Sequence, residues 1–311
     1  MTFSSEKDAR FGTADGARLR LCSVTHDILG DPFWAVYRRG LRDAAERFDV
    51  AVHHRAPERF SPELQAELLR SAIDERPDGI LATIPDAEAV DGPLRSAIDA
   101  GIPVIAVNAA DPRAAAERIP YLRYVGADDA TGGRAAAERV LAERAVRGAL
   151  WIDHYLVDNA CHLARGGAFA AALEEQDVRV ARVRVTGEDH ARSVATIAAW
   201  VADHPDLDAV CTLGPPGCRA AIDALERERR LVDVTHVSFD LAPAQLEAVR
   251  MGRLACTIDS QQYLQGYLGV TLLTLFCDHG FLPADDVLTG PAIIDATNVE
   301  QVLASVEAGT R

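Results

Sequence analysis

The stretch Thr25-His26-Asp27-Ile28-Leu29-Gly30-Asp31-Pro32-Phe33-Trp34 is the segment of this chain that says most about its fold. It follows an apolar, strand-like run at residues 19–24 and opens an amphipathic helix pattern. Asp31 is suited to cap that helix, because its carboxylate accepts from N–H groups of the first turn, and Pro32 has no N–H to lose there. A strand that leads directly into such a helix is the repeating unit of a parallel α/β sheet.

The same turn predicts a ligand site. Phe33 begins an apolar stripe with helical spacing, whereas Trp34 lies about 100° away from it, so we expect Trp34 not to be buried in the core. Open parallel sheets bind ligands at the carboxyl ends of their strands. An aromatic pair and the carboxylate of Asp31 at that edge suit a polar, ring-shaped ligand better than phosphate. The alternative, an ordinary helix start with an aromatic that merely packs, stays open.

The composition narrows the class of protein. The 311 residues fit two domains, and 49% apolar and 25% charged residues are typical of a globular protein. A net charge of −15 argues against a nucleic-acid surface. No apolar run approaches the roughly 20 residues that span a bilayer, and the run at 267–277 predicts a buried helix. No secretory signal is visible in the first 20 residues, which leaves a cytoplasmic protein and a missing export segment as alternatives.

Motifs of catalysis, cofactor binding and metal binding are missing from the sequence. The six cysteines show no CxxC spacing, and there is no GxGxxG, P-loop, GxSxG or HExxH motif. We expect His53-His54 to be solvated at a strand end, Asp128-Asp129 to cap a helix, and Gly132-Gly133 to allow a helix to pack closely on its sheet. The sequence therefore predicts a protein that is not an enzyme, with no cofactor and no metal.

Short apolar runs alternate with helical patterns in two successive blocks. In the first block, strands are predicted at residues 18–25, 50–54, 79–84 and 103–108, and helices at 32–48, 62–73 and 87–100. In the second block, strands are predicted at 148–153, 179–185, 209–213, 235–239 and 254–258, and helices at 134–145, 165–175, 192–203, 217–229 and 243–251. This alternation is typical of parallel βαβ units and predicts an α/β fold of two doubly wound parallel-sheet lobes that face each other across a cleft.

Several motifs follow one another in a characteristic order: Asp31-Pro32-Phe33-Trp34, Arg76-Pro77-Asp78-Gly79-Ile80, Ile84-Pro85-Asp86, Gly101-Ile102-Pro103-Val104, Tyr124-Val125-Gly126-Ala127-Asp128, Arg165-Gly166, Ser238-Phe239-Asp240 and Thr257-Ile258-Asp259-Ser260-Gln261-Gln262. In this order the chain resembles the substrate-binding proteins of simple-sugar ABC transporters, which have the type I periplasmic-binding-protein fold typified by ribose-binding protein. The resemblance runs from about residue 18 to the C-terminus.

The resemblance implies a three-crossover hinge, with residues 18–125 and 262–288 in the first lobe, 126–261 and 289–311 in the second, and 1–17 as an N-terminal extension. It implies a sugar stacked on aromatic rings, with its hydroxyls bonded by polar side chains, because an unpaired buried hydroxyl is costly. The implied ligand-binding residues are Asp31, Phe33, Trp34, Thr83, Asn108, Asn159, Arg165, Asp240, Ser260 and Gln261. To these we add His26 and His154, which sit on the same rim.

Departures from the ribose-binding pattern bear on the ligand. Asn108-Ala109 stands where ribose binders have Asp-Arg, Ala127 stands where closer relatives carry Gln, and residues 214–217 lack an Asn-Asp pair. We therefore expect a neutral sugar, sugar alcohol or modified pentose other than ribose. For single residues a plain structural role stays open: Asp240 and Asn108 as strand-end caps, and Arg165 as the partner of a carboxylate in its own lobe.

The resemblance further implies a monomer in the periplasm or at the outer face of the membrane, which delivers its ligand to an ABC-type permease. One alternative is the sugar-sensing domain of a lactose-repressor-type regulator. That class carries an N-terminal helix-turn-helix, whereas here the first strand is predicted near residue 18, and the charge of −15 repels phosphate. The sensing domain of a chemoreceptor or two-component system is a further alternative, because it would use the same cleft.

Overall fold

A computed structural model of the protein describes residues 8–12, 18–27 and 32–311. The chain divides into two compact units, which are treated separately below. The first unit takes in residues 1–127 and 261–289 with Thr310, and the second takes in 128–260 and 290–309 with Arg311. The chain passes between the units near 127, 260 and 289. Residues 126, 127, 261, 289 and 310, which the sequence assigns to the second lobe, fall in the first unit.

The first unit is built on a seven-stranded sheet with the order β1-β3-β2-β4-β5-β6-β12. The pairs β3–β2, β2–β4, β4–β5 and β5–β6 are parallel, and β1 is antiparallel to β3. The strands are β1 (Asp8–Phe11), β2 (Arg20–Val24), β3 (Ala51–Arg55), β4 (Gly79–Ala82), β5 (Val104–Val107), β6 (Tyr124–Ala127) and β12 (Val287–Gly290). Because β1 belongs to the sheet, part of the expected N-terminal extension is a strand of the fold.

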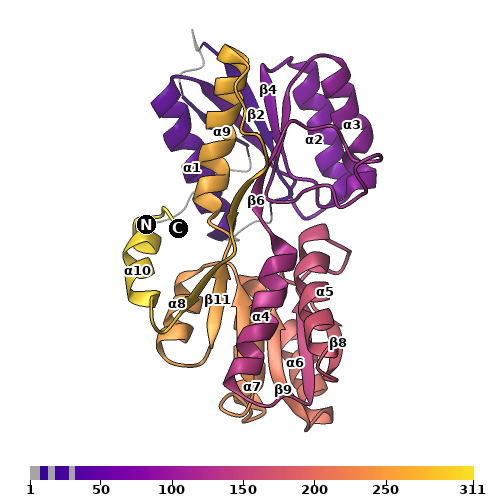
Figure 1. Ribbon diagram of the computed structural model, residues 1–311, viewed down its shortest axis with the longest axis vertical. Helices are drawn as coiled ribbons and strands as arrows, with labels where there is room; N and C mark the ends of the chain where they lie inside the picture. Colours follow the sequence, from indigo (N-terminus) through magenta and orange to yellow (C-terminus); the bar gives the residue numbers. More distant parts are fainter. Residues whose placement is uncertain (1–7, 13–17, 28–31) are drawn as a thin grey trace. The chain divides into compact units, whose positions relative to one another are not determined.

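Helices cover both faces of this sheet: α1 (Pro32–Phe48), α2 (Pro62–Asp74), α3 (Ala87–Asp99) and α9 (Gln262–His279). The α1 and α9 helices are far apart in sequence but lie side by side on one face, and α2 and α3 pack on the other (Figure 1). Two glycines make the α1–α9 crossing possible. A Cβ on Gly40 would stand 2.1 Å from the carbonyl oxygen of Tyr263, and one on Gly266 would stand 2.4 Å from that of Tyr37.

The second unit is built on a six-stranded sheet with the order β13-β11-β10-β9-β7-β8. All neighbouring pairs are parallel except the edge pair of β11 with β13. The strands are β7 (Gly148–Asp153), β8 (Arg179–Arg184), β9 (Leu207–Thr212), β10 (Thr235–Phe239), β11 (Cys256–Asp259) and β13 (Ala292–Asp295). The predicted α/β fold of two mainly parallel sheets is confirmed.

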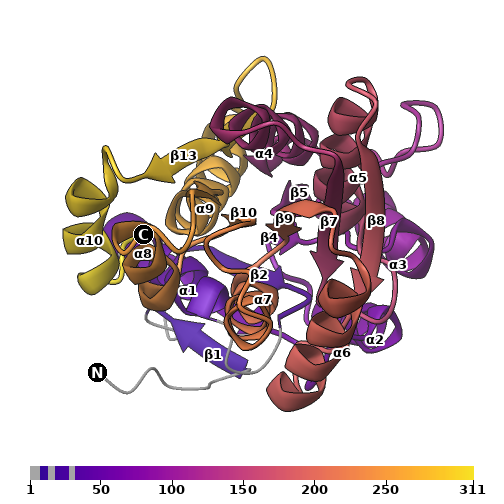
Figure 2. The same ribbon diagram turned by 90° about the horizontal axis from the view of Figure 1, so that it is seen from below.

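The helices of the second unit are α4 (Asp129–Glu143), α5 (Ala160–Glu174), α6 (His190–Asp203), α7 (Pro215–Arg227), α8 (Pro243–Arg250) and α10 (Val299–Glu307). Figure 2 shows α4 and α5 on one side of the sheet and α6 and α7 on the other, each pair with its own apolar cluster. The α4 helix begins at Asp129 and not at 134, because Asp128 caps it by accepting from the backbone N–H of Thr131 at 2.9 Å.

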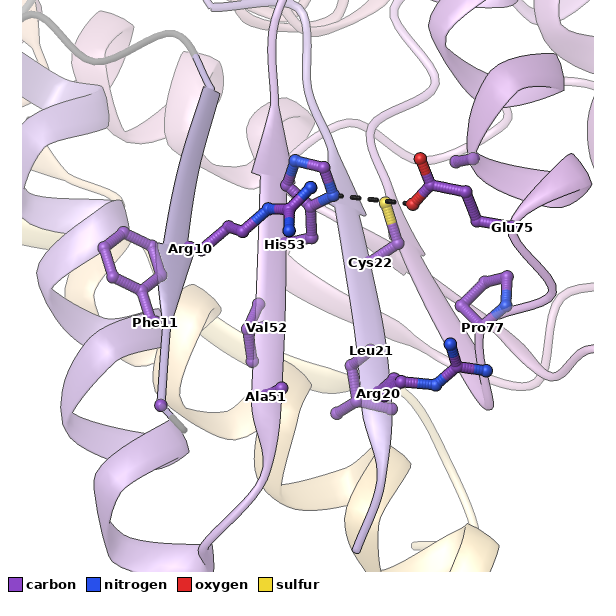
Figure 3. Close-up of a pocket in the computed structure, with 12 residues that line it drawn as sticks. Arg10, Phe11, Arg20, Leu21, Cys22, Ala51, Val52, His53, Glu75 and Pro77 are labelled. Atoms are coloured by element: carbon purple, nitrogen blue, oxygen red, sulfur yellow. Dashed lines mark ion pairs between the residues drawn. The ribbon is translucent and has the colours of Figure 1, made fainter. Parts of the chain in front are cut away.

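Two further features of the described residues bear on function. No helix in this part of the chain combines the length and apolar character that crossing a membrane requires. A shallow cavity of the first unit lies over the sheet face near β1, β3 and the end of α2, lined by Arg10, Arg20, Cys22, His53 and Glu75 among others (Figure 3). None of the ligand-binding residues expected from the sequence lines this cavity.

Candidate ligand-binding site

Arg165 is the centre of a charged cluster in the second unit. Its Nε donates to Asp129 Oδ1 at 2.6 Å and its Nη1 donates to Asp240 Oδ2 at 2.9 Å. Its remaining bonds run to the carbonyl oxygen of Leu213 at 3.1 Å and to Ser260 Oγ at 3.1 Å. Ser260 in turn donates to Asp240 Oδ1 at 2.8 Å. The structure thus brings together three expected ligand-binding residues, Arg165, Asp240 and Ser260, at the carboxyl ends of the strands.

The electrostatics of this cluster follow from its burial. Arg165 is only 4% exposed, and its guanidinium lies 4.7 Å from the centre of the Phe239 ring. Burial alone would lower the pKa of Arg165, but the charges of Asp240 and Asp129 raise it well above its ordinary value. Burial raises the pKa of Asp129, and Arg165 opposes that rise. One cation and two carboxylates share the cluster, so the positive charge of Arg165 is already matched within its own unit.

Close helix packing sets the position of Arg165. A Cβ on Gly133 of α4 would stand 2.2 Å from the carbonyl oxygen of Arg165 on α5, so only glycine permits this approach. Gly132 instead faces the sheet, where an added Cβ would stand 3.0 Å from the Phe239 ring. Asn159 caps α5 by accepting from the backbone N–H of His162 at 3.2 Å. The Nδ2 of Asn159 is buried and has no hydrogen-bond partner among the described residues.

An aromatic and polar group follows β7 in the same unit. The rings of His154, Tyr155 and His162 lie within 4.5 to 4.8 Å of one another, centre to centre. The Nδ1 of His162 and Oδ1 of Asp153 are 2.7 Å apart, and Arg182 also donates to Asp153. Although Asp153 is buried, these hydrogen bonds and charges hold its pKa below the ordinary range. The group fixes the end of β7, where His154 was expected to bind ligand.

The aromatic pair of the first unit is more buried than the sequence indicates. Trp34 is 2% exposed and belongs to the apolar cluster beneath α1 and α9. Its ring packs edge-on against His26, Phe33 and Tyr37 at 5.0 to 5.6 Å. The expectation that Trp34 would not be buried in the core is therefore wrong. The residues that follow β2 pack on the first turn of α1. They enclose Trp34, although this side chain lies off the apolar stripe of the helix.

Polar side chains next to this aromatic group bond within the first unit. The Oγ1 of Thr83 accepts from the backbone N–H of His26 at 3.1 Å and from Gln65 Nε2 at 3.0 Å, so Thr83 acts in the described residues as a buried connector. Arg38 forms an ion pair with Asp27, a buried carboxylate that the sequence reasoning did not select. Asp31, which it did select, lies outside the described residues.

A buried histidine corrects one expectation in this region. His54 was expected to be solvated, yet it is fully buried, and its Nδ1 lies 3.3 Å from Ser23 Oγ. Ser23 Oγ lies 3.0 Å from the hydroxyl of Tyr37. Burial, with a smaller effect of the Arg38 charge, lowers the pKa of His54 to about 3. The two histidines of the pair lie on opposite faces of β3, and His54 points toward the apolar cluster beneath α1.

The strand ends near the crossings form a third polar group. Asn108 Nδ2 donates to Gln265 Oε1 at 3.2 Å, and Gln265 Nε2 donates to Thr289 Oγ1 at 3.3 Å. Gln261 Nε2 donates to the carbonyl oxygen of Thr289 at 2.5 Å. Asn108 and Gln261 were expected from the sequence. Gln265 and Thr289 were not, although Gln265 lies one helical turn after Gln261.

Backbone strain coincides with three of the expected residues. Asn108, Asp240 and Gln261 have φ values of 63°, 64° and 51°, which residues other than glycine rarely adopt. Asp240 pairs its backbone N–H with the carbonyl oxygen of Ile258 at 2.7 Å and accepts at its own carbonyl from Thr257. Such strain persists where the surroundings enforce it, and it is concentrated at functional sites.

Comparison with known proteins agrees with this geometry. A family model described as a periplasmic binding protein domain matches residues 24–279. The xylose/arabinose-binding protein XylF of Sulfolobus acidocaldarius is 26% identical, over 91% of this chain and 73% of its own. The ribose import binding protein RbsB of Bacillus subtilis is 22% identical, over 85% of this chain and 80% of its own.

The solved structures include a carbohydrate transporter from Acidothermus cellulolyticus in complex with myo-inositol. It is 29% identical and superposes with a TM-score of 0.85, over 94% of this chain and 99% of its own. The protein described here belongs to the periplasmic binding protein family. These matches confirm the type I fold and the class expected from the sequence, the non-catalytic solute-binding proteins of sugar ABC transporters.

Proposed function

We propose that the protein binds a neutral sugar, sugar alcohol or modified pentose. The observation that carries this proposal is the charge state of the Arg165 cluster. Two carboxylates and a carbonyl oxygen already bond the guanidinium, so no net positive charge is left to attract an anion. Carboxylate and hydroxyl groups of Asp240 and Ser260 are instead suited to bond sugar hydroxyls.

The first unit would supply the apolar face and further hydroxyl partners. Phe33 and Trp34 would pack against the C–H face of the ring, with His26 beside them. Asn108 and Gln261 would bond hydroxyls near the crossings, and Asn159 would do so from the second unit. Relatives of the chain are named for binding xylose, arabinose or ribose, or were solved with myo-inositol, and all four compounds are neutral and rich in hydroxyl groups. At Asn108-Ala109 and 214–217 the sequence differs from the ribose-binding pattern, which favours a ligand other than ribose.

The proposed role is delivery of this ligand, outside the cytoplasmic membrane, to an ABC-type permease by a monomeric receptor. Closing of the two units on the ligand would produce the form that docks on the permease, as in other hinge-closing binding proteins. Three separate crossings between the units support such a hinge, since the unit boundaries fall at short strand-end segments.

A thermal-shift screen tests the ligand class. The wild-type protein is heated with D-xylose, L-arabinose, D-ribose, D-allose, D-tagatose and myo-inositol, and with glucuronate and glucose 6-phosphate as anionic controls. A bound ligand at about 100 times its Kd raises the free energy of unfolding by about 2.7 kcal/mol. We expect one or more neutral compounds to raise Tm and the anions not to do so. Preferential stabilisation by an anion would contradict the proposal.

A further inference from the structure

Three glycines from two segments of the chain pack around the imidazole of His154: Gly187, and Gly214 with Gly217 at the start of α7. A Cβ built on Gly214 would stand 2.7 Å from His154 Cε1, closer than any real contact. Cβ atoms on Gly187 and Gly217 would meet the ring at 3.4 Å and 3.7 Å, which are ordinary contacts. The rings of Tyr155 and His162 also pack against it, with their centres 4.8 Å and 4.5 Å from its own. Gly214 is thus the position whose missing side chain makes room for the imidazole.

The two nitrogens of this ring have different surroundings. Nδ1 is buried, has no hydrogen-bond partner within residues 8–12, 18–27 and 32–311, and is the nitrogen that faces Gly217. Nε2 is on the side of Gly214, 3.5 Å from the place where a Cβ would stand there. No side-chain hydrogen bond links the His154 ring to another described residue. Burial, together with the charge of His162, lowers the pKa of His154 well below its ordinary value, so the ring is neutral at pH 7.

His154 and Asp240 meet at the same point. The Oδ2 of Asp240 is 3.6 Å from the Cβ position of Gly214, and Nε2 of His154 is 3.5 Å from it. A carboxylate acceptor and an imidazole nitrogen therefore border the space that a side chain at 214 would fill.

We propose that His154 is a specificity-determining residue. Its Nε2–H donates to one hydroxyl oxygen of the ligand, and the neighbouring hydroxyl donates to the carboxylate of Asp240. The tautomer follows from the burial of Nδ1. A proton on Nδ1 would leave a buried N–H donor without an acceptor. A buried lone pair without a donor costs less free energy. Gly214 then serves the site by leaving the space that the imidazole needs. This inference rests on the proposed binding of a neutral sugar or polyol.

The ligand chemistry follows from these two groups. Asp240 requires a hydroxyl that donates, and Nε2–H requires an oxygen that accepts. Two adjacent hydroxyls supply both, and so does a hydroxyl beside a ring oxygen. A ligand with a deoxy position at that place would leave His154 Nε2–H unpaired in a buried site, which disfavours it. The site thereby selects for an intact vicinal diol and against the deoxy analogue.

The test compares three variants by isothermal titration calorimetry with D-xylose and myo-inositol. His154→Phe keeps a flat ring and removes both nitrogens, and we expect affinity to fall about tenfold or more, as for the loss of one buried hydrogen bond. Gly214→Ala places a methyl against Cε1, and we expect a similar loss. Gly217→Ala is the matched control, because its methyl meets the same ring at an ordinary distance, and we expect affinity within about twofold of wild type.

A series of monodeoxy analogues of the bound compound makes the assignment specific. Wild type is expected to bind one of them about tenfold more weakly than the parent, and His154→Phe is expected to bind parent and that analogue equally. Melting curves establish that each variant is folded. If His154→Phe does not fold, Gly214→Ala carries the test. Unchanged affinity in both variants, with wild type binding, overturns the assignment alone. If wild type binds no sugar or polyol, the proposed function fails and the assignment with it.

Discussion

The guanidinium of Arg165 and the carboxylate of Asp240 form a buried ion pair, with Nη1 of Arg165 2.9 Å from Oδ2 of Asp240. Their positions in the chain are 75 residues apart, and α5 and the end of β10 bring them together. Burying two charges is costly unless geometry and further hydrogen bonds repay it. The additional bonds of Arg165 to Asp129, Leu213 and Ser260 provide that compensation. The pair fixes the orientation of the Asp240 carboxylate.

Replacing Arg165 by Lys tests this orientation. An ammonium keeps the charge but cannot reproduce the fork that bonds Asp129 and Asp240 at once. We expect sugar affinity to fall at least about tenfold, equivalent to one charge-assisted hydrogen bond of about 1.5–3 kcal/mol. Calorimetric titration measures it. Arg134→Lys is the control, since the exposed pair of Arg134 with Glu175 is 3.5 Å long and contributes little. Equal affinity in the two variants would contradict this role.

Trp34 links stability to binding. Because its ring is buried against His26, Phe33 and Tyr37, we expect Trp34→Ala to lower the free energy of unfolding by about 3–5 kcal/mol as well as to abolish binding. From the sequence alone, a small stability cost was expected. Trp34→Phe is expected to recover most of the stability. Chemical denaturation and titration are the two measurements, and Trp200→Ala, at a half-buried tryptophan stacked on His204, controls for the loss of a tryptophan. A stable Trp34→Ala variant that binds normally would refute both roles.

Much of the fold can be predicted from periodicity, because helices and buried parallel strands carry strong local patterns. The predicted bounds of α1, β7 and β10 agree with the structure. The strands β1, β12 and β13 were not predicted. Each has four residues, lies at the edge of a sheet and is fixed by pairing with a distant strand and not by its own sequence.

The site could be predicted in part for the same reason. The family resemblance implied Asn108, Asp240 and Ser260, which follow strands of the two sheets, and residues that follow parallel strands meet at one edge of a sheet. Asp129 was expected to be a helix cap, and its pairing with Arg165, 36 positions away, depends on how closely α4 packs on α5. The Thr83–Gln65 bond and the place of His154 among three glycines are also tertiary contacts. No local pattern in the sequence specifies contacts of this kind.

His236 predicts how stability depends on pH. Burial lowers the pKa of His236 to about 3 in the folded protein. A histidine in the unfolded chain has a pKa of about 6.5. Between these values unfolding takes up a proton, so stability is full above about pH 6.5 and falls as the pH drops toward 3, by up to about 1.4 kcal/mol per pH unit. We expect His236→Gln to make this slope shallower by about one proton, as measured by urea denaturation from pH 7 to 4. His54 behaves in the same way, so some slope remains. An unchanged slope in His236→Gln would count against the assignment.

Because its backbone is strained, replacing Asn108 by Gly tests its role in binding separately from stability. Glycine adopts a positive φ without penalty, so Asp177→Gly, at a turn after α5 with φ 59°, should leave stability unchanged or raise it by up to about 1 kcal/mol. Asn108→Gly relieves similar strain but removes the bond to Gln265. We expect it to remain about as stable as wild type and to lose sugar affinity at least about tenfold. Thermal melts and titrations of the two variants distinguish these outcomes. Full affinity in Asn108→Gly would show that Asn108 does not contact the ligand.

The three crossings between the units predict a change in shape on binding. If the units close on a sugar by bending at residues 127–128, 260–261 and 289–290, small-angle scattering should give a smaller radius of gyration with the ligand than without it. Since closure requires the ligand to bond the second unit, Arg165→Lys should show no compaction at a ligand concentration that saturates wild type. Arg134→Lys should compact as wild type does. A radius of gyration that stays constant while calorimetry shows saturation would mean that binding does not close the hinge.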